Sequence, residues 1–126
     1  MKKILLVEDD VALATTYRER LEMDGYKVVE ARDGDQALAK ALEFRPDLVL
    51  LDVMMPKVSG FEVLDILRNT PEVAGVKVIM LSAMGQEKDK ERAKELGVDD
   101  YLVKSQVSIA DVVARVKTLL GGNGIL

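Results

Sequence analysis

The chain has 126 residues, 48% of them apolar, and a net charge of −4, which together suit one globular domain with a core of its own. Acidic and basic residues are interspersed, which argues against nucleic acid or an anionic membrane as a direct partner. There is no cysteine and no histidine, which excludes disulfides, thiol chemistry, and catalysis, metal binding or phosphorylation at a histidine of this chain. No apolar run is long enough to span a bilayer, and acidic residues come too early for a signal peptide.

Strand and helix patterns alternate along the first part of the chain. Residues 3–8 predict a buried strand, and residues 11–25 predict a helix that ends at a glycine. Residues 27–31 predict a second, more exposed strand, followed by a helix that Asp33 caps and Pro46 closes. This alternation is typical of proteins with a parallel sheet.

The third strand pattern is the strongest in the chain. Residues 48–51 form an unbroken apolar run, which is typical of a strand buried on both faces of a parallel sheet. Asp52 follows directly, and a carboxylate there is costly unless it is paired or bound to a cation. Residues 59–62 then form a capping box that opens a third helix. Asp52 is therefore the lead candidate for a reactive group.

The alternation continues in the second half. Residues 76–81 predict a fourth strand, and residues 101–103 predict a short fifth strand. Between them, residues 86–96 have the composition of a helix, but only Ala93 and Leu96 are apolar. We therefore expect this fourth helix to be the least anchored of the helices and among the first to shift or fray.

The last helix pattern begins at Ser108, which can form a capping pair with Asp111. Strictly alternating strands and helices predict an α/β fold with a single doubly wound, flavodoxin-like sheet. Its five parallel strands are expected in the order 2-1-3-4-5, with helices on both faces and a crevice between the first and third strands. Residues 1–120 form the predicted domain, and residues 121–126 a flexible tail or the start of a linker. The domain is either a stand-alone protein or part of a longer one.

Polar side chains follow four of the predicted strands. Asp9 and Asp10 follow the first strand, Asp52 the third, Ser82 the fourth and Lys104 the fifth. Because the carboxyl ends of parallel strands share one edge of the sheet, we expect these side chains to gather there. Three carboxylates and one ammonium leave an excess of two negative charges, which one Mg²⁺ would cancel with oxygen ligands of the kind it prefers.

These groups together suit phosphoryl transfer to a carboxylate. With a cation bound, Asp52 can attack a phosphoryl group and form an aspartyl phosphate. Mg²⁺ and Lys104 would offset charge on the phosphoryl oxygens, and Ser82 could hydrogen-bond one of them. The chain has no Gly-rich loop of the Walker type, which argues against a nucleotide as the donor.

Four short motifs stand at these positions: V-E-D-D near the start, D-V-M-M-P-x-x-S-G-F-E in the middle, L-S-A after the fourth strand, and D-D-Y-L-V-K before the last helix. With them, the sequence resembles a bacterial two-component response-regulator receiver domain, of the chemotaxis-regulator type, along essentially its whole length. The resemblance implies that Asp52 is the phosphoacceptor and that Lys104 meets the phosphoryl group. It also implies that Asp9, Asp10, Asp52 and the backbone carbonyl of Met54 hold Mg²⁺, with Mn²⁺ as an alternative.

The resemblance further implies a two-state switch driven by phosphorylation. Ser82 matches the switch hydroxyl, and Tyr101 matches the switch aromatic that turns inward and reshapes the face of the fourth helix, fifth strand and fifth helix. The implied donor is the phosphohistidine of a sensor histidine kinase or a phosphotransfer protein, and the output protein is unknown. We expect a cytoplasmic protein, monomeric or dimeric on phosphorylation, that catalyses only its own phosphoryl transfer and slow dephosphorylation.

Two further expectations concern the residue after Lys104 and the methionines near Asp52 and Ser82. The lysine of the family is usually followed by proline, often through a cis bond, whereas Ser105 follows Lys104 here. We predict a cis Lys104–Ser105 bond even so, at a cost of about 2.5–4 kcal/mol. Met54 and Met84 stand two residues after the phosphoacceptor and after the switch hydroxyl, where the side chains of the family flank the path of hydrolytic water. Two bulky apolar side chains there predict slow self-dephosphorylation.

Other interpretations remain open at this point. Asp10 can cap the first helix, alone or in addition to binding a metal. A phosphatase of the haloacid-dehalogenase type would also use an aspartate nucleophile, but it needs a second aspartate where Met54 stands. An interaction module that works without phosphorylation is a third possibility, although it would not require the acidic residues and Lys104.

Overall fold

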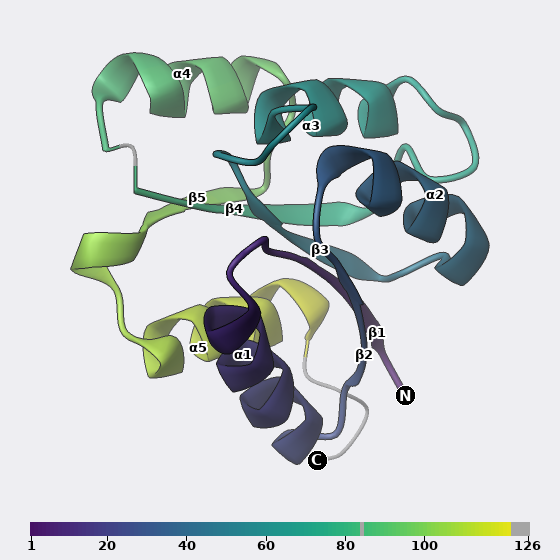
Figure 1. The fold of residues 1–126 in the computed structure, drawn as a ribbon, viewed down its shortest axis with the longest axis vertical. Helices are drawn as coiled ribbons and strands as arrows, with labels where there is room; N and C mark the ends of the chain where they lie inside the picture. Colours follow the sequence, from purple (N-terminus) through teal and green to yellow (C-terminus); the bar gives the residue numbers. More distant parts are fainter. Residues whose placement is uncertain (84, 122–126) are drawn as a thin grey trace.

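The computed structural model describes residues 1–83 and 85–121, whose arrangement is shown in Figure 1. Within these residues, five strands form one sheet in the predicted order, β2-β1-β3-β4-β5. The strands are β1 (Lys3–Val7), β2 (Lys27–Ala31), β3 (Leu48–Asp52), β4 (Lys77–Ser82) and β5 (Asp100–Val103). Every neighbouring pair is parallel, so all five strands end at the same edge of the sheet.

Five α-helices of the described residues cover the two faces of this sheet (Figure 1). The helices are α1 (Val11–Met23), α2 (Gly34–Phe44), α3 (Gly60–Arg68), α4 (Glu87–Glu95) and α5 (Ile109–Leu120). Helices α1 and α5 pack on one face, and α2, α3 and α4 pack on the other, so an apolar core lies on each side. Among the described helices, none combines the length and the apolar character that crossing a bilayer requires.

Strand β3 lies at the centre of the sheet, between β1 and β4. All five of its residues are buried, as the apolar run predicted. Burying a leucine or valine side chain stabilises a fold by roughly 1.5–3 kcal/mol, so this strand contributes much of the apolar burial. The carboxylate of Asp52, its last residue, is therefore carried by the most deeply anchored element of the sheet.

Side-chain caps begin three helices where the sequence predicted them. Asp33 caps α2 through its carboxylate. Ser59 with Glu62, and Ser108 with Asp111, form complete capping boxes at the starts of α3 and α5. The predicted boundary after residue 120 stays a prediction, because residues 122–126 of the predicted tail lie outside the part that the structure describes.

Helix α4 is thinly anchored, as its composition predicted. Only Asp89 and Ala93 are buried within it, whereas α3, which also has nine residues, buries five. Leu96, just after α4, is partly buried against the core. The guanidinium of Arg92 lies 4.4 Å from the centre of the Phe61 ring, so a cation–π contact adds to these few anchors. Few apolar contacts therefore oppose a displacement of α4.

Gly60 lets α3 begin directly against the end of β3. Its N–H donates to the carbonyl oxygen of Val53 at 2.8 Å. A Cβ at this position would lie 2.5 Å from the carbonyl oxygen of Asp52 and 2.7 Å from the Cα of Val53. Both are backbone atoms, which cannot move aside unless the end of β3 shifts. The absence of a side chain at residue 60 thus supports the backbone that presents Asp52.

Gly60→Ala should lower the free energy of unfolding by about 1–3 kcal/mol, because the added methyl group overpacks this contact. Gly75→Ala is the matched control, since no atom beyond the adjacent residues lies within 4 Å of the position its Cβ would take. Urea denaturation of both variants measures the difference. Equal stability of the two variants would contradict the close approach of α3 to β3.

Candidate functional site

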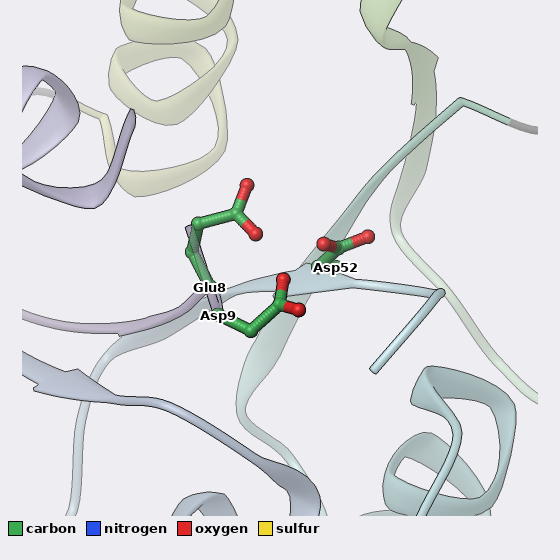
Figure 2. Close-up of side chains that lie close together, drawn as sticks. All are labelled: Glu8, Asp9 and Asp52. Carbon is green, nitrogen blue, oxygen red and sulfur yellow. The ribbon is translucent and has the colours of Figure 1, made fainter. Parts of the chain in front are cut away.

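Three carboxylates gather at the carboxyl edge of the sheet (Figure 2). Glu8 and Asp9 come directly after β1, and Asp52 ends β3. One oxygen from each carboxylate lies within 4.8 Å of the other two. Glu8 and Asp52 are only 3% and 5% exposed, whereas Asp9 is exposed to solvent. We call Glu8, Asp9 and Asp52 the acidic cluster.

The strand register explains why these side chains meet. Val7 of β1 lies opposite Leu51 of β3 in the parallel ladder. The next residue of each chain segment, Glu8 and Asp52, therefore comes level at adjacent strand ends. Two carboxylates are buried side by side as a direct result of this pairing.

Lys104, directly after β5, reaches two of the three carboxylates. Its Nζ donates to Oε1 of Glu8 at 2.9 Å and to Oδ2 of Asp52 at 3.3 Å. Burial acts to lower the pKa of Lys104, but the hydrogen bond to Glu8 and the charges of Asp52 and Glu8 outweigh it, so the pKa is raised. The ammonium is therefore charged at neutral pH and offsets one of the three negative charges.

Glu8 is the most buried carboxylate of the cluster. Burial raises its pKa, and the neighbouring Asp52 carboxylate raises it further, while Lys104 acts in the opposite direction. Its Oε2 atom is buried and accepts no hydrogen bond from the residues that the structure describes. A buried carboxylate oxygen without a donor is costly. Glu8 Oε2 would therefore be stabilised by a further donor or a cation.

The acidic cluster is consistent with a bound divalent cation. It offers oxygen ligands from three carboxylates, and after Lys104 is counted it keeps two excess negative charges. Mg²⁺ in proteins takes one or two carboxylates and retains several waters, which suits a cluster with one exposed member. The backbone N–H of Met54 donates to Oδ1 of Asp52 at 3.1 Å and orients that carboxylate. The role of the Met54 carbonyl and the identity of the metal stay predictions.

Asp10, which the sequence placed among the metal ligands, is not part of the acidic cluster. It is the N-cap of α1, where its Oδ1 accepts a hydrogen bond from the backbone N–H of Leu13 at 3.1 Å. The third carboxylate of the cluster instead comes from Glu8, which the sequence analysis did not single out. A signal was present in the strand pattern. The apolar run of β1 ends at Val7, so Glu8 is the first acid after it, just as Asp52 directly follows the apolar run of β3.

The two predicted switch residues lie on neighbouring strands. Ser82 ends β4 and is 0% exposed, and Tyr101 of β5 is partly buried against the core beneath α2, α3 and α4. Burial raises the pKa of the Tyr101 phenol, and a hydrogen bond with the side chain of Ser82 acts to lower it. The side chains of the two residues are therefore directly linked.

The family model for the response regulator receiver domain matches residues 4–117, nearly the whole chain. The chain belongs to this family. The five-stranded parallel sheet described above is thus the sheet of a receiver domain of two-component systems.

Known relatives agree with this assignment. The transcriptional regulatory protein CpxR of Escherichia coli is 48% identical over 120 residues, which cover 95% of this chain and 50% of that protein. The DNA-binding dual master transcriptional regulator RpaA of Synechocystis sp. is 42% identical over 120 residues, covering 95% and 49%. A structure of the Francisella response regulator 1452 receiver domain has a TM-score of 0.89 at 32% identity, covering 96% and 98%. The receiver domain therefore spans about half the length of the curated relatives it matches.

Lys104 of this receiver domain reaches the carboxylates without a cis peptide bond. The prediction of a cis Lys104–Ser105 bond is wrong, because none of the peptide bonds in the described residues is cis. Without proline, a cis bond would cost about 2.5–4 kcal/mol. The chain instead turns through the short 3₁₀ helix η1 (Lys104–Gln106), and the Lys104 ammonium still bonds Asp52 and Glu8.

Substitutions at the two neighbouring aspartates should separate metal binding from helix capping. Asp9→Ala should weaken Mg²⁺ binding about tenfold or more, because it removes a charged ligand. Asp10→Ala should lower the free energy of unfolding by about 1 kcal/mol through loss of the cap, with the Mg²⁺ dissociation constant unchanged. Titration calorimetry and thermal unfolding measure the two effects.

The control is Asp10→Ser, which keeps a capping oxygen and should restore the stability lost in Asp10→Ala. If Asp10→Ala weakened Mg²⁺ binding as much as Asp9→Ala, Asp10 would return to the ligand set.

Proposed function

We propose that this receiver domain accepts a phosphoryl group on Asp52, with Mg²⁺ in the acidic cluster. The proposed donor is the phosphohistidine of a sensor histidine kinase or a phosphotransfer protein. The supporting observation is that three carboxylates converge within 4.8 Å and that Lys104 bonds two of them. This set offers a nucleophile, a metal site and a fixed positive charge in one place.

In the proposed step, a carboxylate oxygen of Asp52 attacks the phosphorus of the phosphohistidine. A P–O bond forms while the P–N bond breaks, and the leaving nitrogen keeps the electron pair and takes up a proton from water. Lys104, already 3.3 Å from Oδ2 of Asp52, is placed to bond an oxygen of the transferred group. A bound Mg²⁺ would offset the charge on the phosphoryl oxygens.

We further propose that phosphorylation shifts a two-state equilibrium through α4, β5 and α5. Ser82 shares a hydrogen bond with Tyr101, so a move of the Ser82 hydroxyl toward a phosphoryl group on Asp52 would free Tyr101 to turn further inward. Because α4 buries only two of its own residues, a few kcal/mol of differential contact would displace it.

The proposed output partner is an unknown protein that binds the face of α4, β5 and α5. We expect the domain to act in the cytoplasm, as a monomer or a phosphorylation-dependent dimer, without direct contact to nucleic acid or a membrane. One relative is named as DNA-binding, but the matched segment makes up only 49% of that protein. The output partner of this chain is therefore not indicated by the relatives that it matches.

We propose no enzymatic turnover beyond phosphoryl transfer to the domain itself and its slow hydrolysis. The matched relatives are named as transcriptional regulators. A haloacid-dehalogenase-type phosphatase would need an aspartate two residues after Asp52, where Met54 stands with 60% exposure. An interaction module without phosphorylation would not need two carboxylates buried next to each other.

Acetyl phosphate with Mg²⁺ should add one phosphoryl group to the protein, and removal of Mg²⁺ with EDTA should prevent it. Asp52→Asn should abolish this labelling, because it removes the nucleophilic carboxylate. Asp47→Asn is a matched control at the opposite end of β3, where Asp47 accepts a hydrogen bond from the backbone N–H of Lys3 at 2.8 Å. Intact-protein mass spectrometry measures the result, and wild-type labelling of Asp52→Asn would remove Asp52 from this role.

The phosphorylated form should persist for minutes or longer. The apolar side chain of Met54 is 60% exposed and would restrict the approach of water to the phosphoryl group, whereas the second predicted position, Met84, lies outside the described residues. Met54→Asn should shorten the half-life several-fold, and Met23→Asn, at an 81% exposed methionine on the last turn of α1, should not. Phosphate release measures both, and a wild-type half-life of seconds would contradict slow hydrolysis.

A further inference from the structure

A small cavity lies next to the acidic cluster, and Glu8 and Asp52 form part of its wall. It leaves about 10 Å³ for the centre of a water molecule, which is about the minimum that one water needs. Its walls come from β1, β3, β4 and α1, and the lining residues are Leu6, Val7, Glu8, Tyr17, Leu50, Asp52 and Leu81. Three of these carry polar groups, and a structural water needs two to four polar partners.

Glu8 brings an unsatisfied acceptor to this cavity. Its side chain is only 3% exposed, and its Oε2 accepts no hydrogen bond from the described residues. Its other oxygen is already bonded to Lys104 at 2.9 Å. A donor that satisfied Oε2 would fix the orientation of this carboxylate.

Tyr17 brings a donor to the same cavity. It lies on the inner face of α1 and is 5% exposed. Burial raises the pKa of its phenol, Lys104 acts to lower it and Glu8 raises it, so both charged groups act on this hydroxyl. Because the pKa is raised, the phenol keeps its proton at neutral pH and can donate it in a hydrogen bond.

We propose that Tyr17 is a positioning residue of the phosphorylation site, whose hydroxyl donates through one water in this cavity to Oε2 of Glu8. This inference rests on the proposed function, because it assigns Glu8 to a cation site. The hydrogen bond fixes the orientation of the Glu8 carboxylate within the acidic cluster. Tyr17 does not touch the reacting atoms, and its effect reaches them through Glu8.

The simpler interpretation is that Tyr17 only fills the core between α1 and the sheet. Tyr26 provides the comparison for that interpretation. It is 4% exposed and belongs to the same apolar core, but it does not line the cavity, and the charge that acts on it is Asp24. A role in packing alone would leave the Mg²⁺ affinity unchanged in both Tyr17→Phe and Tyr26→Phe.

Mg²⁺ titrations of the wild-type chain and of Tyr17→Phe and Tyr26→Phe test the proposal. Tyr17→Phe keeps the ring and should weaken Mg²⁺ binding about tenfold, equivalent to about 1.4 kcal/mol, while Tyr26→Phe binds like the wild type. In wild-type protein labelled with ¹³C at tyrosine Cζ, Mg²⁺ should shift the Tyr17 resonance and leave the Tyr26 resonance in place. The NMR measurement needs no variant, so an unmoved Tyr17 resonance counts against the proposal even if Tyr17→Phe folds poorly.

Two results would overturn the inference while the proposed function stands. One is wild-type Mg²⁺ affinity in Tyr17→Phe, and the other is a Tyr17 Cζ resonance that Mg²⁺ does not move in a wild-type protein that binds Mg²⁺. A wild-type chain that neither binds Mg²⁺ nor accepts a phosphoryl group would instead overturn the proposed function and this inference with it.

Discussion

A shortage of positive charge at one edge of the sheet is the constraint on which the rest of the structure depends. Glu8 and Asp52 are almost fully buried and share a single ammonium, that of Lys104. Asp9 adds a third carboxylate to the same place. Buried charge is tolerated only when it is paired or bound to a cation, so the fold itself creates the demand that a divalent ion would meet. The chemistry of the site follows from this demand.

The fold concentrates the charge through elements far apart in the sequence. Parallel pairing of β1 with β3 brings Glu8 level with Asp52, and the central position of β3 removes both from water. Gly60 allows α3 to close against the same strand end. By contrast, α4 buries few residues, and its Asp89 acts electrostatically on Tyr101, which is hydrogen-bonded to Ser82.

The features that could be predicted from the sequence were those with a local signal. Alternating patterns predicted the strand order, and Asp52 and Lys104 were identifiable as charged residues directly after apolar strands. Glu8 was missed because residues 3–8 were read as one strand, although the apolar run ends at Val7, and the pairing register with β3 then brings Glu8 beside Asp52. The approach of Tyr17 to the acidic cluster and the burial of Asp89 in α4 depend on side-chain packing, which residue spacing does not determine.

The most direct test of the charge constraint is to locate the cation. Mn²⁺ takes oxygen ligands as Mg²⁺ does and scatters anomalously, so crystals of the domain soaked in Mn²⁺ would reveal each bound ion. A single strong anomalous peak is predicted at the acidic cluster. The Mn²⁺ ion that gives it should be bonded to Asp9 and Asp52, with Glu8 as a ligand directly or through water. No peak at the cluster, or an ion bound at Asp10 instead, would contradict it.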